Sequence, residues 1–167
     1  VSLITAFNTI NSGFQVAVMA PTEILARQHY DLAKNIFPSN ISTKLISGKS
    51  NYKEKKIILN DLINNNIDII FGTHAIFQKT VKFKKLGLII IDEQHKFGVN
   101  QRKRLSDKGG NDCDVLLMTA TPIPRTLTMT IYGDMDLSII REKPKNRKMI
   151  KTYSKLESKI NDVIKFI

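Results

Sequence analysis

Two adjacent carboxylates, Asp92 and Glu93, are the side chains whose type and spacing best suit chemistry in this sequence. They directly follow the apolar run 86–91, which is broken only by Gly87. Such a run is typical of a strand buried on both faces of a parallel sheet, so the acids would reach water only at its carboxyl end, where open α/β sheets bind ligands. One acid could hold the magnesium ion of a nucleotide while the other orients or deprotonates a water. An acidic surface turn has the same composition, and spacing alone does not separate the two interpretations.

Three more polar clusters follow apolar runs in the same way: Ala-Pro-Thr-Glu at 20–23, Gly-Thr-His at 72–74 and Thr-Ala-Thr at 119–121. The carboxyl ends of parallel strands lie along one edge of a sheet, so clusters at those ends would converge in space. Independent surface turns would not be expected to repeat this arrangement. The pattern therefore predicts an active edge formed by segments that are distant in the sequence.

The periodicity of apolar residues predicts the elements that must position these clusters. Helices are expected over 1–11, 22–37, 51–63, 99–108, 122–132 and from 154 onward, with Thr22, Asn51 and Thr121 as N-cap residues and Glu54 completing a capping box. Buried strands are expected over 15–20, 67–71, 86–91 and 114–118, further strands over 42–47 and 136–140, and an exposed hairpin or extended edge segment over 79–85. Because strands alternate with helices, the predicted fold class is α/β, a doubly wound parallel sheet with helices on both faces.

Composition narrows the classes of function. The 167 residues carry 26 Lys and Arg against 15 Asp and Glu, and the formal charge of +11 favours a polyanionic partner such as nucleic acid, although a lysine-rich surface can also serve solvation alone. Cys113 is the one cysteine, which excludes a disulfide framework and a cysteine-based zinc site. His29 and His74 have no partner at metal-ligand spacing, so neither is assigned to a metal. No apolar run approaches the length of a membrane span and no signal peptide opens the sequence, so a cytoplasmic protein is expected.

The order and wording of the clusters resemble the first motor domain of superfamily-2 helicases, and within them the RecG-like helicases of branched DNA. Residues 20–26 resemble motif Ia of that family, 72–76 motif Ib, 92–95 with 97–99 the Walker B box, and 119–126 motif III. The Asp-Glu-Gln-His form of the box favours RecG-like enzymes over the alternative, a transcription-repair coupling translocase, whose box is closer to Asp-Glu-Glu-His or Asp-Glu-Glu-Gln. The resemblance implies a RecA-like fold and an ATP-dependent DNA helicase that remodels replication forks and Holliday junctions in repair and recombination.

The same resemblance implies roles for individual residues, with ATP and Mg²⁺ as cofactors. Asp92 would bind the magnesium of MgATP through water, and Glu93 would activate the water that attacks the γ-phosphate. Coupling between nucleotide and DNA is implied for Gln94, His95, Thr119 and Thr121. Contact with the DNA phosphate backbone is implied for Pro21, Thr22, Gly72, Thr73 and Arg125.

Two parts of the family's motor have no counterpart in the sequence. The phosphate-binding loop of the type G-x-x-x-x-G-K-[ST] is absent, and the second motor domain is absent apart from its first residues. We therefore expect residues 1–142 to be an N-terminally truncated first motor domain, 143–152 a linker and 153–167 the start of the second motor domain, with the wedge domain elsewhere in a longer parent. The chain alone is expected not to hydrolyse ATP. A non-hydrolysing nucleic-acid-binding fragment and an inactive truncated product are the alternatives.

Overall fold

The chain divides into two units, Val1–Pro122 and Ile123–Ile167, and a parallel β-sheet forms the centre of the first. The computed structural model describes residues 1–48, 51–93, 113–121, 136–142 and 152–166. The helices among these residues include none that is long and apolar enough to cross a membrane.

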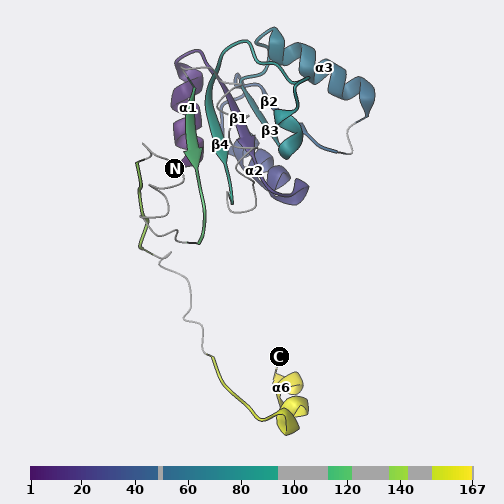
Figure 1. Cartoon of the computed structure of the whole chain (residues 1–167), viewed down its shortest axis with the longest axis vertical. Coiled ribbons are helices and arrows are strands. Elements are labelled where there is room, and N and C mark those ends of the chain that lie inside the picture. Colours follow the sequence, from purple (N-terminus) through teal and green to yellow (C-terminus); the bar gives the residue numbers. More distant parts are fainter. Residues whose placement is uncertain (49–50, 94–112, 122–135, 143–151, 167) are drawn as a thin grey trace. The chain divides into compact units, whose positions relative to one another are not determined.

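Five strands form the described sheet, in the order β2-β3-β1-β4-β5 (Figure 1). They are β1 (Gln15–Met19), β2 (Thr43–Ile46), β3 (Ile69–Gly72), β4 (Leu86–Ile91) and β5 (Asp114–Leu117). Every neighbouring pair is parallel. From the central β1 the chain fills one side of the sheet with β2 and β3 and then the other side with β4 and β5, as the predicted doubly wound fold requires.

Helices cover both faces of the sheet. They are α1 (Ser2–Asn11), α2 (Glu23–Ile36) and α3 (Tyr52–Ile63), and a 3₁₀ helix, η1 (His74–Phe77), follows β3. Strand residues alternate between two buried clusters: Val16 and Val18 lie in the cluster that α1 and α2 cover, whereas Ala17 and Met19 lie in the one that α3 covers. This period of two is the consequence of strand geometry. The predicted α/β class with helices on both faces is confirmed.

Strand β4 is buried along its whole length, and Ile89, Ile90 and Ile91 are fully buried. Burial of an aliphatic side chain of this size stabilises the folded state by about 1.5–3 kcal/mol relative to exposure. These three residues therefore anchor β4 within the sheet. The first polar side chain after these buried residues is that of Asp92, which directly follows β4.

Two predicted helix starts form as expected. Thr22 Oγ1 accepts a hydrogen bond from the backbone N–H of Leu25 at 3.3 Å and caps α2. Asn51 and Glu54 form a reciprocal capping box at α3, with bonds of 2.8 and 3.2 Å. Local side-chain chemistry is enough to fix these two boundaries.

The hairpin or edge segment predicted over 79–85 is wrong. These residues form no strand, and Val81 is buried. The backbone N–H groups of Lys84 and Lys85 donate instead to Oε1 of Gln15, at 2.8 and 3.1 Å. Because a side chain takes up these donors, the segment needs no partner strand and serves as the connection from η1 into β4.

Strand β5 is present but is not buried as predicted. Asp114 is exposed and the other three residues are only partly buried, because β5 lies at an edge of the described sheet. The strand predicted over 136–140 is wrong. These residues are exposed, and among the described residues no strand lies beside them to form backbone hydrogen bonds. The helices predicted over 99–108 and 122–132 lie outside the described residues.

The second unit contains a short helical segment. A 3₁₀ turn, η4 (Glu157–Lys159), leads into α6 (Ile160–Phe166). The helix predicted from residue 154 therefore begins three residues later, at Glu157.

Candidate functional site

The carboxyl ends of the strands lie level with one another. Met19 at the end of β1 pairs with Gly72 of β3 and with Ile91 of β4, and Ile91 pairs in turn with Leu117 of β5. The backbone ladder continues one step further, because the N–H of Asp92 donates to the carbonyl oxygen of Met19 at 2.9 Å. The polar segments at 20–23, 72–74, 92–93 and 119–121 therefore begin along one edge, and the convergence predicted from the sequence is confirmed.

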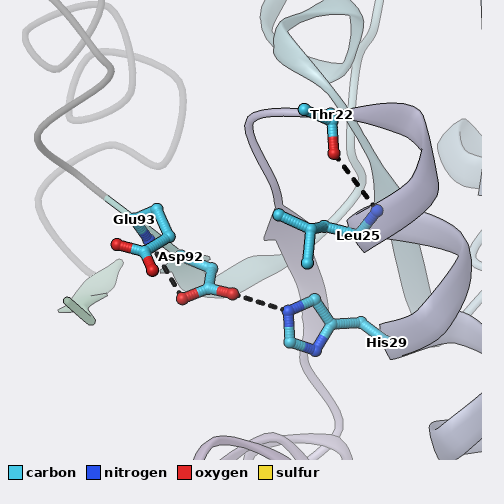
Figure 2. A network of polar contacts seen from close by, with 5 residues as sticks. All are labelled: Thr22, Leu25, His29, Asp92 and Glu93. Carbon is cyan, nitrogen blue, oxygen red and sulfur yellow. Dashed lines mark hydrogen bonds and ion pairs between the residues drawn. The ribbon is translucent and has the colours of Figure 1, made fainter. Parts of the chain in front are cut away.

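Asp92 is held by hydrogen bonds to both carboxylate oxygens. The backbone N–H of Glu93 donates to Oδ1 at 3.0 Å, and Oδ2 lies 2.8 Å from Nε2 of His29 on α2 (Figure 2). The side chains of Asp92 and His29 are 21% and 25% exposed, so the contact is partly accessible to water. Because a carboxylate can only accept hydrogen bonds, Nε2 of His29 donates in this contact when the Asp92 side chain is ionised.

Glu93 adopts a left-handed backbone conformation, with φ at 52°. For a residue with a Cβ atom this conformation costs on the order of 1–2 kcal/mol. The turn separates the directions of the two acids: Figure 2 shows Asp92 reaching toward α2, with Glu93 on the side of Asp92 away from His29. Adjacent carboxylates are thus free to serve different tasks.

Thr119 and Thr121 form a local turn at the end of β5. Their hydroxyl oxygens lie 3.0 Å apart, and the backbone N–H of Thr121 donates to Oγ1 of Thr119 at 3.2 Å. The helix that Thr121 is predicted to cap lies outside the described residues. Thr119 lies one residue past the level of Asp92, because Met118 donates from its N–H to the carbonyl of Ile91 at 2.8 Å.

Gly72 serves the packing of the sheet. A Cβ atom at this position would lie 2.6 Å from the carbonyl oxygen of Ile46 and 2.8 Å from its Cγ2 atom. Thr73 and Pro21, which follow β3 and β1, are partly exposed at the same edge, and Thr22 is exposed there. The remaining predicted site residues, Gln94, His95 and Arg125, lie outside the described residues.

Two polar residues with long-range contacts were missed by the sequence analysis. The partner of His29 lies 63 positions along the chain, so local spacing carried no signal for it. Gln15 is fully buried, and its Nε2 donates to the carbonyls of Leu62 and Ile67 at 3.0 and 2.8 Å, in addition to the two bonds that its Oε1 accepts. A glutamine opening an otherwise apolar strand was the available clue. Gln15 fastens the amino-terminal end of the sheet, opposite the candidate site.

The described donor groups fit a magnesium ion that is held mainly by a nucleotide. No group of three or more potential metal ligands occurs among the described residues, so this part of the chain offers no complete ligand cage. Mg²⁺ ordinarily keeps several waters and takes one or two carboxylates together with phosphate oxygens. Among the described residues each oxygen of Asp92 accepts one hydrogen bond, which leaves it capacity for contact with a metal-bound water.

Comparison with known proteins agrees with this architecture. Residues 1–130 match the DEAD/DEAH box helicase family, and the chain belongs to that family. Within it the chain is RecG-like: it is 51% identical over 146 residues to the ATP-dependent DNA helicase RecG of Streptococcus pneumoniae, covering 87% of this chain and 22% of the relative. The RecG of Bacillus subtilis is 47% identical over 168 residues, covering 100% of this chain and 24% of the relative.

A solved structure described as RecG bound to a three-way DNA junction superposes with a TM-score of 0.81 and 39% identity, covering 99% of this chain and 22% of that one. The RecA-like helicase fold and the RecG-like character predicted from the sequence are therefore confirmed. The chain spans only 22% to 24% of the length of the two RecG relatives.

Proposed function

We propose that this chain forms part of the ATP-driven motor of a DNA helicase that remodels branched DNA in recombination and repair. The observation that carries the proposal is the level edge at which four polar segments meet, with Asp92 and Glu93 at the end of an interior strand. The similarity to RecG proteins and to a RecG bound to a three-way junction supports the branched substrate. Such a motor would work in the cytoplasm.

Asp92 and Glu93 divide the chemistry of ATP hydrolysis between them. A magnesium ion held at this edge would supply positive charge that offsets the charge developing on the phosphate during hydrolysis. Asp92 would hold this ion through water, in an orientation fixed by His29 and by the backbone N–H of Glu93. Glu93 would orient the attacking water and accept its proton, and the left-handed turn keeps its carboxylate apart from that of Asp92.

The remaining edge residues would connect the nucleotide to DNA. Thr119 and Thr121, together with Gln94 and His95, are proposed to relay the nucleotide state. Backbone amides and short hydroxyls bind phosphates without reading bases, which suits the DNA contacts proposed for Pro21, Thr22, Gly72, Thr73 and Arg125. The formal charge of +11 supports a polyanionic partner.

We assign residues 1–142 to the first motor domain, 143–152 to a linker and 153–167 to the start of a second motor domain. The phosphate-binding loop, most of the second motor domain and a wedge domain would come from other parts of a longer chain. The 167-residue chain alone would then not hydrolyse ATP, because nothing in its sequence cradles the β- and γ-phosphates.

The test uses a chimera in which this chain replaces the matching residues of the Bacillus subtilis RecG. Junction-stimulated ATP hydrolysis is expected in the chimera, and Glu93→Gln should abolish hydrolysis while leaving ATP binding intact, because the amide cannot accept the proton of the attacking water. Hydrolysis at the unsubstituted rate by Glu93→Gln would remove Glu93 from this role. Measurable turnover by the 167-residue chain alone would show that it hydrolyses ATP without the missing loop.

A further inference from the structure

The contact between His29 and Asp92 joins two parts of the site that the sequence keeps far apart. His29 lies in the second turn of α2, and Asp92 follows the last residue of β4. Nε2 and Oδ2 lie 2.8 Å apart, the distance of a good charge-assisted hydrogen bond (Figure 2). The bond therefore ties the nucleotide-facing carboxylate directly to a helix.

The same helix, α2, begins at Thr22, which is one of the residues proposed to contact DNA. Thr22 caps α2, and His29 follows it by seven residues, which is about two helical turns. The two residues thus lie on one side of α2, roughly 10 Å apart along its axis at about 1.5 Å per residue. A rigid helix transmits a displacement at His29 to its first turn.

The face of α2 that contains His29 is seated on the sheet by small residues. Ala26 and Ala33 are fully buried, and their spacing of three and four residues from His29 places all three on one helical face. Small side chains give α2 little interlocking surface along this line. The hydrogen bond from His29 to Asp92 adds a polar contact between this face of α2 and the end of β4.

We propose that His29 is a positioning residue that couples the nucleotide state at Asp92 to the placement of α2, and so makes DNA affinity depend on bound nucleotide. The inference rests on the proposed function. A magnesium-bound water that donates to Oδ2 of Asp92 competes with His29 for the electron density of that oxygen, which weakens the bond to α2 when the nucleotide binds. By thermodynamic linkage, DNA bound at the start of α2 alters nucleotide affinity by the same factor.

A structural role alone makes a different prediction. If the bond only stabilises the fold, its loss lowers the melting temperature and weakens both ligands without changing the effect of one on the other. If it couples the sites, the ratio of DNA affinities with and without nucleotide changes. The ratio is therefore the quantity to measure.

The experiment uses the chimera with Bacillus subtilis RecG and a fluorescein-labelled three-way junction. Dissociation constants are measured by anisotropy without nucleotide and with ADP, beryllium fluoride and Mg²⁺, and nucleotide affinity is measured with and without DNA. His29→Leu removes the donor at similar size, and His29→Gln keeps an N–H donor near the place of Nε2. Asn35→Leu is the matched control, an exposed polar position on the same helix.

The nucleotide-dependent ratio of affinities is expected to fall about 5- to 10-fold in His29→Leu, within the usual range of coupling between sites. His29→Gln should keep most of the ratio, and Asn35→Leu should keep all of it. An unchanged ratio in His29→Leu, or an equal loss in His29→Gln, would overturn the coupling role and leave the proposed function standing. An unsubstituted chimera that shows no nucleotide effect on DNA would overturn both.

Discussion

Replacing Gly72 with alanine asks whether this glycine serves the sheet or a ligand. The new Cβ atom would lie 2.6 Å from the carbonyl oxygen of Ile46 and 3.0 Å from Cγ1 of Ile76. The nearer atom belongs to the backbone of β2, which pairs with β3 through Ile46 and Gly72. It can move away only if the strand ladder is disturbed.

The magnitude follows from two opposing effects. Inserting a methyl group into a filled site costs on the order of 1–3 kcal/mol, and a backbone neighbour places Gly72→Ala at the upper end. The lower entropy of the unfolded alanine chain returns roughly 0.4–1 kcal/mol. The free energy of unfolding should therefore fall by about 2 kcal/mol, which lowers the melting temperature by roughly 8 °C for a unit of this size.

Urea unfolding of the 167-residue chain, followed by circular dichroism, measures this change. Gly48→Ala is the matched control, because apart from its chain neighbours no atom of the described residues lies within 4 Å of a Cβ built there, and its stability should change by less than about 0.5 kcal/mol. Equal stabilities for the two variants would refute the steric reasoning and return Gly72 to a role in ligand binding alone.

Three further changes test other features of the described chain. Glu93→Gly should be more stable than Glu93→Ala by about 1 kcal/mol in urea unfolding, since only glycine relieves the left-handed φ of 52°; equal stabilities would count against that strain. Gln15→Leu should lower the free energy of unfolding by about 3 kcal/mol, because the carbonyl of Ile67 loses the donor that Gln15 supplies and the N–H groups of Lys84 and Lys85 lose their acceptor; a loss below about 1 kcal/mol would contradict the importance of these bonds. Burial, and then the charge of Asp114, raise the pKa of the Cys113 thiol from 9.0 to about 11. Below pH 9 the thiol should therefore carry about 100-fold less thiolate than an ordinary cysteine and react correspondingly slowly with iodoacetamide. Asp114→Asn should speed this reaction slightly, because it removes the negative charge beside the thiol. Alkylation at the rate of the unfolded chain would contradict the raised pKa.

The features predicted correctly depend on neighbours within a few residues. An unbroken aliphatic run identified β4, and a threonine or an asparagine with a glutamate three positions on identified the starts of α2 and α3. These signals are local because helix caps are closed by side chains close in sequence and because burial on both faces demands an apolar side chain at every position. The level strand ends followed from parallel topology, which alternation of elements implies.

The incorrect predictions share a dependence on distant partners. Residues 136–140 have a strand-like composition but no paired strand among the described residues, and β5 is only partly buried because of its place in the sheet order. The segment 79–85 alternates as an edge strand would, yet Gln15 takes up its backbone donors from 69 and 70 positions away. The composition of such a segment is the same whether or not it pairs as a buried strand, so residues distant in the sequence decide which structure forms.

The sequence by itself determined the α/β class, the caps of α2 and α3, and the meeting of four polar segments at one edge, because each rests on short-range periodicity or on the direction of parallel strands. Only the tertiary structure decided that His29 holds Asp92, that Glu93 turns left-handed, and that Gly72 is required by Ile46. The contacts of His29 and Gly72 form between residues that the sheet order brings together, and no local pattern encodes a partner that is 63 residues away.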